Sequence, residues 1–207
     1  MLSLTASELR LLHRLSTPAK VQDFVNAIPF NFADTCLSPR MVLRRNTAHC
    51  MEGALFAALA LRVQGHPPLV VDLDVGRGDD AHVIAVYRYR GHWGAISKTN
   101  HAVLRYRDPV YRSIRELVMS YFHEYSDKKG HKTLRSYTRP IDLRRFDRIN
   151  WMTSTKGVEE IHDFLADATH LPVLPSPAMI KRLRRTDAIE RKVGEIVEWK
   201  KSRPRTT

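Results

Sequence analysis

The stretch from residue 46 to residue 62 is apolar on almost every side of a helix and carries a cysteine near its start. It reads Asn-Thr-Ala-His-Cys-Met-Glu-Gly-Ala-Leu-Phe-Ala-Ala-Leu-Ala-Leu-Arg. A helix that is apolar all round is buried, so the rest of the chain has to fold around it. We expect Asn46 or Thr47 to cap this helix through a side-chain oxygen, which places Cys50 at about the third helical position. There the helix dipole favours a thiolate over a thiol.

Two interpretations of Cys50 follow from its position. A free cysteine most often behaves as a small buried hydrophobic residue. A nucleophilic cysteine needs a base that meets it in space. His82 is the best candidate base, because it begins the run 82–89, which is rich in β-branched and aromatic residues and predicts a strand. Residues 90–92 predict a turn, and a returning strand is expected from Trp93.

A cysteine at a helix start, then a histidine at a strand start, then a Gly-Trp-type hairpin is an order that resembles the transglutaminase-like superfamily, specifically its small bacterial members. The resemblance covers roughly residues 17–146 and is carried by residues 48–54, 80–83 and 92–100. It implies a fold similar to that of papain-like enzymes, with a buried Cys-bearing helix packed on a mostly antiparallel sheet. It also implies thiol attack on an amide, giving a thioester that passes to water or to an amine. Cys50 would be the nucleophile and His82 the general base.

The third catalytic residue of that family is an Asp, usually four positions after the hairpin Trp, and here that position is Ser97. A carboxylate orients the imidazole and stabilises its charged form, whereas a serine can only orient it. Asn100 is the alternative, since a Cys-His-Asn arrangement is chemically workable. A two-residue turn, with Tyr89 opposite His92, puts Ser97 on the His82 face, whereas a three-residue turn puts Asn100 opposite His82. We favour Asn100, because an amide holds an imidazole better than a hydroxyl does.

Hydrophobic periodicity predicts the other elements of an α+β fold. We expect helices over 7–15, 18–28 and 111–125, a loop over 30–45, and strands over 68–74, 101–107 and 134–143. Helices followed by a mostly antiparallel sheet define a core domain over residues 1–146. Residues 147–207 are expected to form a C-terminal helical extension, with a last helix over about 178–200 and a basic tail after it.

The chain of 207 residues has 34 Lys and Arg against 22 Asp and Glu, a net charge of +12. Such a charge suits nucleic acid, an anionic membrane surface or an acidic substrate. The basic residues are spread along the chain, and no helix-turn-helix, zinc-finger or RNA-binding aromatic motif accompanies them. We therefore favour other partners over nucleic acid, and we expect Lys98 to be a solvated charge at a strand end.

The sequence also favours a cytoplasmic protein without cofactor or metal. No apolar run reaches the roughly 20 residues of a transmembrane segment, and the N-terminus does not resemble a signal peptide. Cys36 and Cys50 give no disulfide framework. Gly-rich phosphate loops and zinc-binding spacings are missing from the sequence. His49 and Cys50 do not suggest a metal pair, because neighbours on a helix diverge by about 100°.

Three hypotheses of function remain. The first is a cysteine enzyme of peptidase or amidohydrolase type, which hydrolyses or transfers an amide bond of a peptide or protein substrate. The second is a transglutaminase-like domain that binds a peptide or protein without catalysis, and the missing Asp motivates it. The third is a basic binder of nucleic acid or of an anionic surface.

Overall fold

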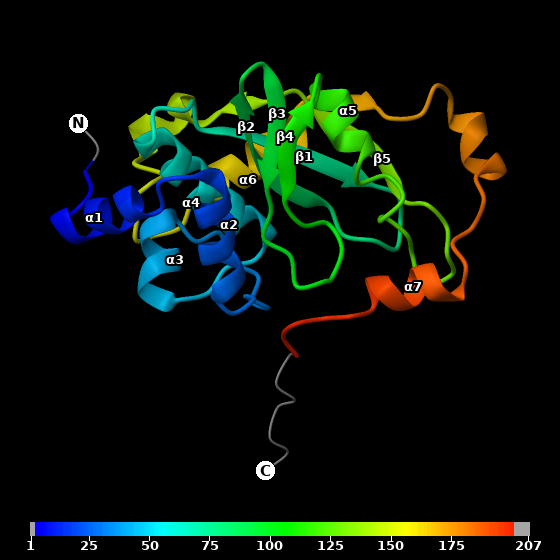
Figure 1. Cartoon of the computed structure of the whole chain (residues 1–207), viewed down its shortest axis with the longest axis horizontal. Coiled ribbons are helices and arrows are strands. Elements are labelled where there is room, and N and C mark those ends of the chain that lie inside the picture. Colours follow the sequence, from blue (N-terminus) through cyan, green and yellow to red (C-terminus); the bar gives the residue numbers. More distant parts are fainter. Residues whose placement is uncertain (1–2, 201–207) are drawn as a thin grey trace, which may run out of the picture.

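The computed structural model describes residues 3–200 and shows an α+β protein built on a mostly antiparallel sheet (Figure 1). The strands run in the order β4-β3-β2-β1-β5-β7, and β6, which is not part of this order, also pairs with β1. Their bounds are β1 (Leu69–Val75), β2 (His82–Tyr89), β3 (His92–Ile96), β4 (Arg107–Tyr111), β5 (Leu134–Thr138), β6 (Ile141–Asp142) and β7 (His170–Pro172). Each of these strand pairings is antiparallel.

The two faces of the sheet are covered by different helices. Successive residues of a strand point to opposite faces, so Val83 and Ala85 of β2 pack in one core and Ile84 and Val86 in another. The first core contains side chains of α1 (Ala6–Arg14), α2 (Pro18–Ala27), α3 (Pro39–Arg45), α4 (Cys50–Val63) and α6 (Glu159–Asp167). The second contains α5 (Ile114–Met119). Within residues 3–200, no helix is long and apolar enough to cross a membrane.

The buried Cys-bearing helix is confirmed as α4. Every residue from Met51 to Leu61 is buried, and the helix packs against β1 and β2. The helix can be buried because its own side chains are mostly Ala, Leu and Phe on every side, so it has no polar face that needs solvent. The cysteine end of the helix is thereby held against the sheet.

Lys98 is fully buried against α4, so the expected solvated charge is wrong. Its Nζ donates a hydrogen bond to the Ile28 carbonyl oxygen at 2.5 Å, and burial lowers its pKa to about 8. The contact with α4 is made at Gly53, where a Cβ would lie 2.3 Å from Lys98 Cβ. The helix and the end of β3 therefore approach each other at a distance that only glycine permits.

In the Gly53→Ala variant overpacking is expected to cost about 3 kcal/mol, the upper end of its usual range, because the 2.3 Å contact displaces the neighbouring backbone. The gain of about 1 kcal/mol that Ala brings inside a helix leaves a net loss of stability of about 2 kcal/mol. Urea unfolding followed by circular dichroism measures the difference. Gly194→Ala in α7 (Ala188–Gly194) is the control, since no atom lies within 4 Å of its Cβ position. Equal stability of Gly53→Ala and wild type would contradict the close approach.

Several predicted boundaries are wrong in the middle of the chain. The loop expected over 30–45 contains α3, and the helix expected over 111–125 is shortened to α5. The strand expected over 101–107 is displaced, because residues 101–106 are irregular and β4 begins at Arg107. The strand expected over 134–143 is divided into β5 and β6. These segments are short, so tertiary contacts rather than periodicity decide their ends.

Residues 147–200 are not purely helical, which corrects the expected C-terminal helical extension. They include the edge strand β7, which pairs with β5, and the helix expected over 178–200 is broken into a 3₁₀ helix (Pro177–Arg182) and α7. Leu183 of that pattern packs against the second core, but Ile189 and Ile196 find no core and are 77% and 56% exposed. The basic tail predicted after residue 200 lies outside the described residues.

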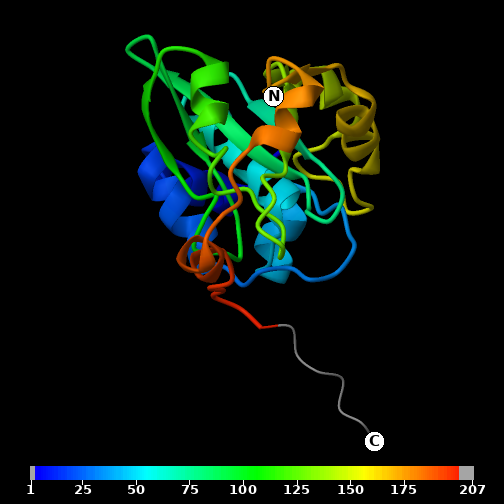
Figure 2. The same ribbon diagram turned by 90° about the vertical axis from the view of Figure 1, so that its right-hand side faces the viewer.

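The segment after α7 lies beside the loop between β3 and β4 (Figures 1 and 2). His101 and Val197 form an isolated antiparallel bridge. The Ala102 amide donates to the Ile196 carbonyl oxygen, and the Glu198 amide donates to the Asn100 carbonyl oxygen. The loop that follows β3 is therefore held by residues from the other end of the sequence.

Candidate active site

Cys50 is the first residue of α4, and it follows the N-cap residue His49, whose backbone is extended. The predicted cap by Asn46 or Thr47 is wrong. Asn46 instead ends α3 in a left-handed conformation, and the Thr47 hydroxyl donates a hydrogen bond to the Pro29 carbonyl oxygen. Cys50 thus lies nearer the helix end than expected, where the dipole is strongest. It lines a cavity of about 930 Å³.

The imidazole of His49 is held beside the thiol by two contacts. Its Nε2 lies 2.6 Å from the Thr35 carbonyl oxygen, and 3.4 Å from Glu52 Oε1. A carbonyl oxygen only accepts, so Nε2 carries a proton and donates it. Burial disfavours the charged ring, but hydrogen bonding and charge from Cys50, together with the charge of Glu52, raise the pKa of His49 to about 9.

The pKa of the Cys50 thiol is strongly lowered. Burial raises this pKa, but hydrogen bonding by His49 and by His82, and the charges of both rings, bring it down to about 5. With the pKa of His49 near 9, a thiolate–imidazolium pair exists between about pH 5 and pH 9. Cys36 lines the same cavity, and burial and nearby carboxylates raise its pKa to about 11. Cys50 is therefore the cysteine whose surroundings favour the thiolate, which is the nucleophilic form.

His82 begins β2 and is buried, and its Nε2 lies 2.7 Å from Ser97 Oγ. The Ser97 hydroxyl donates its proton to the Leu104 carbonyl oxygen at 2.5 Å. Ser97 Oγ must then accept from His82 Nε2, which leaves Nδ1 of His82 as the nitrogen without a proton when the ring is neutral. Ser97 therefore fixes the tautomer of His82 in which Nδ1, on the side of the ring away from Ser97, is free to accept a proton.

The strand register places Ser97, and not Asn100, beside His82. Tyr89 pairs with His92, as in the two-residue turn that puts Ser97 on the His82 face. Asn100 uses both ends of its amide on the backbone of Trp199: Nδ2 donates to the carbonyl oxygen, and Oδ1 accepts from the amide, each at 2.9 Å. Our preference for Asn100 as the partner of the imidazole is thus corrected. The group that contacts the imidazole is therefore the hydroxyl of Ser97 and not a carboxylate.

Glu52 anchors the loop that passes over the site. Its side chain is fully buried. Its carboxylate accepts hydrogen bonds from Asn31 Nδ2 at 2.9 Å, Thr35 Oγ1 at 2.7 Å, the Leu37 amide at 2.9 Å and the His49 amide at 2.9 Å. The residues from 31 to 37 are thereby fastened to the first turn of α4. One carboxylate thus positions both the loop and His49.

The sequence analysis missed His49 as a member of the site. The argument that neighbours on a helix diverge by about 100° does not apply, because His49 precedes the helix. A signal was present: Glu52 follows His49 by three residues, the spacing at which an acidic side chain reaches back to the N-cap amide. Recognising that spacing would have placed the cap at His49.

Among the residues that the structure describes, no group of three His, Cys, Asp or Glu side chains is arranged to hold a metal ion. Comparison of the sequence with protein-family models and with curated proteins found no match.

Proposed function

We propose that this protein is a cysteine enzyme that cleaves or transfers an amide bond of a peptide or protein through a thioester on Cys50. The observation that carries the proposal is a thiol at a helix N-terminus, open to a cavity of about 930 Å³, whose pKa two histidines lower to about 5. Burial alone would have the opposite effect on this thiol. A structural cysteine has no need of such surroundings.

In the proposed acylation, Cys50 attacks the carbonyl carbon of the amide and the C–N bond breaks. The proton lost by the Cys50 thiol when the thiolate forms is held on Nδ1 of His82, and His82 passes it to the leaving amine nitrogen. In the second step His82 removes a proton from water, which attacks the thioester and releases the acid and the Cys50 thiolate. An amine in place of water gives transfer instead of hydrolysis.

The two histidines have different roles in this scheme. The pKa of His49 is raised to about 9, so at neutral pH this ring stays charged and stabilises the thiolate. His82 is oriented by Ser97, which lacks the negative charge that a carboxylate would add. The proposal therefore assigns charge stabilisation to His49 and proton transfer to His82.

Alkylation with iodoacetamide across pH, with the adducts mapped by mass spectrometry, tests the activated thiol. The rate at Cys50 is expected to be half-maximal near pH 5, and Cys36 is the internal control, with a half-maximal rate near pH 11. A half-maximal rate at Cys50 near the ordinary value of 9.0 would overturn the activation.

Catalysis is tested by incubating the protein with a peptide mixture and counting new amino termini or new amide links. Either product is expected with the wild type and not with Cys50→Ala. An activated thiol with neither product would contradict the enzyme and favour the second hypothesis, a binding domain.

A further inference from the structure

The cavity beside Cys50 is acidic, although the chain as a whole carries a net charge of +12. No Lys or Arg is among the described residues that line it. The basic lining residues are histidines: His49, His162 and His170. Its carboxylates come from segments far apart in the sequence: Asp34, Asp72, Asp74, Asp80, Glu159 and Asp163.

Little positive charge offsets these carboxylates. Asp72 Oδ2 lies 3.0 Å from His170 Nε2, and Asp163 Oδ1 lies 3.3 Å from His162 Nδ1. Asp74 accepts a hydrogen bond from the neutral Ser136 hydroxyl. Within residues 3–200, none of the six carboxylates forms an ion pair with a Lys or Arg. The charge of His49 is balanced by the Cys50 thiolate beside it, so the six carboxylates give the cavity a negative field.

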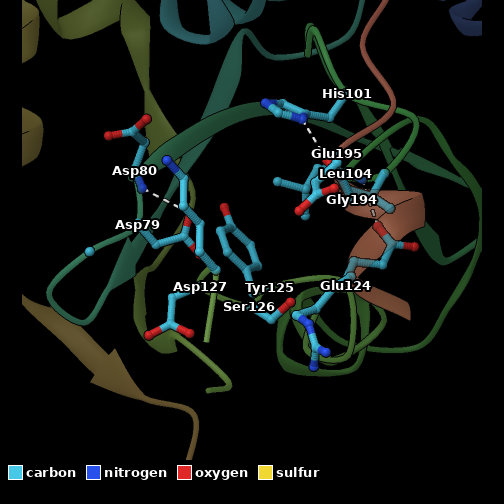
Figure 3. A pocket seen from close by; sticks show the side chains of 14 residues that line it. Asp79, Asp80, His101, Leu104, Glu124, Tyr125, Ser126, Asp127, Gly194 and Glu195 are labelled. Carbon is cyan, nitrogen blue, oxygen red and sulfur yellow. Dashed lines mark hydrogen bonds between the residues drawn. The ribbon is translucent and has the colours of Figure 1, made fainter. Parts of the chain in front are cut away.

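Asp80 also lines a second cavity, of about 520 Å³, which contains an unsatisfied polar group. Tyr125 is only 1% exposed, and its hydroxyl has no hydrogen-bond partner in the described structure. Figure 3 shows the Tyr125 oxygen lying between Asp79 and Asp80 on one side and His101 on the other. A buried hydroxyl without a partner costs free energy, so it indicates a polar ligand group in this second cavity, whose lining also includes Lys128 and Arg191.

We infer that the cleft beside Cys50 takes a cationic peptide segment, whose lysine or arginine side chains lie against these carboxylates; this inference rests on the proposed function. An ammonium or guanidinium supplies hydrogen-bond donors to these carboxylates, but accepts none. A cleft lined by one sign of charge concentrates the opposite sign and raises association rates by about 10–1,000-fold. The positive remainder of the protein repels the same segment, which makes the cleft its preferred site.

The test measures the charge preference of Cys50 with methanethiosulfonate reagents in a Cys36→Ser background. The thiolate attacks the reagent sulfur, a disulfide forms, and methanesulfinate leaves. Rates are compared for a trimethylammonium-ethyl reagent, a sulfonatoethyl reagent and the uncharged methyl reagent, with 2-mercaptoethanol as the free-thiol reference. Relative to that reference, the ratio of the cationic to the anionic rate at Cys50 is expected to be about tenfold higher or more at low salt. Added salt should lower it.

Two double variants isolate the cleft. Asp80→Asn with Asp163→Asn is expected to lower the rate ratio several-fold. Asp23→Asn with Asp108→Asn removes the same net charge at exposed positions outside both cavities, and is expected to leave it unchanged. An equal fall in both double variants would mean a general charge effect and would overturn the inference.

The uncharged reagent separates this inference from the proposed function. A fast neutral reaction with no charge preference beyond that of the free thiol would overturn the cationic substrate and leave the activated thiol intact. A slow neutral reaction, half-maximal near pH 9, would overturn the proposed function itself. A preference for the anionic reagent would overturn the inference whatever the neutral rate.

Discussion

Replacing both His49 and His82 by alanine is expected to move the half-maximal alkylation of Cys50 from near pH 5 to pH 9 or above. These two rings lower the pKa of the thiol, while burial, which remains in the variant, raises it. At pH 6 the thiolate fraction then falls about 1,000-fold, since each pKa unit is a factor of ten. A thiolate of higher pKa is intrinsically more nucleophilic, so the measured rate at pH 6 falls less, by roughly tenfold or more.

The midpoint of the rate profile is the decisive measurement, because it reports the pKa independently of nucleophilicity. His13→Ala with His123→Ala is the matched control, since both of these histidines are exposed and neither lines a described cavity. A midpoint that stays near pH 5 in the His49 and His82 double variant would show that the helix dipole, and not the imidazoles, activates the thiol. The single variants divide the shift between the two rings.

The Glu52→Ala variant is expected to be less stable than the wild type by about 3–5 kcal/mol, because removing one member of a buried, hydrogen-bonded ionic group leaves its partners unsatisfied. The orphaned donors are the Leu37 and His49 amides and the side chains of Asn31 and Thr35. Urea unfolding measures the loss. Glu52→Gln keeps the shape and part of the hydrogen bonding, so its stability is expected to lie between those of Glu52→Ala and the wild type. A loss below about 1 kcal/mol would contradict the anchoring role.

Removing the charge of Glu52 is also expected to affect the Cys50 thiol. The charge of Glu52 raises the pKa of His49, and charged His49 lowers the pKa of Cys50. Glu52→Gln is therefore expected to move the alkylation midpoint of Cys50 upward. A purely structural role for Glu52 would leave this midpoint in place, provided that the variant is folded at the assay temperature.

Local patterns in the sequence were enough to predict the buried helix and the hairpin of β2 and β3. An uninterrupted apolar run and a turn flanked by β-branched residues each contain their own evidence. The same patterns placed Cys50 at a helix start and His82 at a strand start. Catalysis by these residues stays a prediction.

Features that join distant segments were out of reach. The acidic cavity combines Asp34, Asp80 and Asp163. These residues are far apart in the sequence, so they form no acidic run that stands out in a chain with a net positive charge. The choice between Ser97 and Asn100 depended on a register that a single residue shifts, and on Trp199, which binds Asn100 from 99 positions away. Only the folded chain brings these groups together.

Residues 196–199 form hydrogen bonds with the loop after β3, so this loop is completed only when the end of the chain is present. Ser97 orients His82 and is itself fixed by Leu104, at the two ends of a loop whose middle is bound by this segment. During synthesis, a chain that has emerged only as far as β7 contains Cys50 and His82, but not residues 196–199, which hold the loop between Ser97 and Leu104. The newly made protein therefore acquires its complete site late, after the sheet and α4 are already in place.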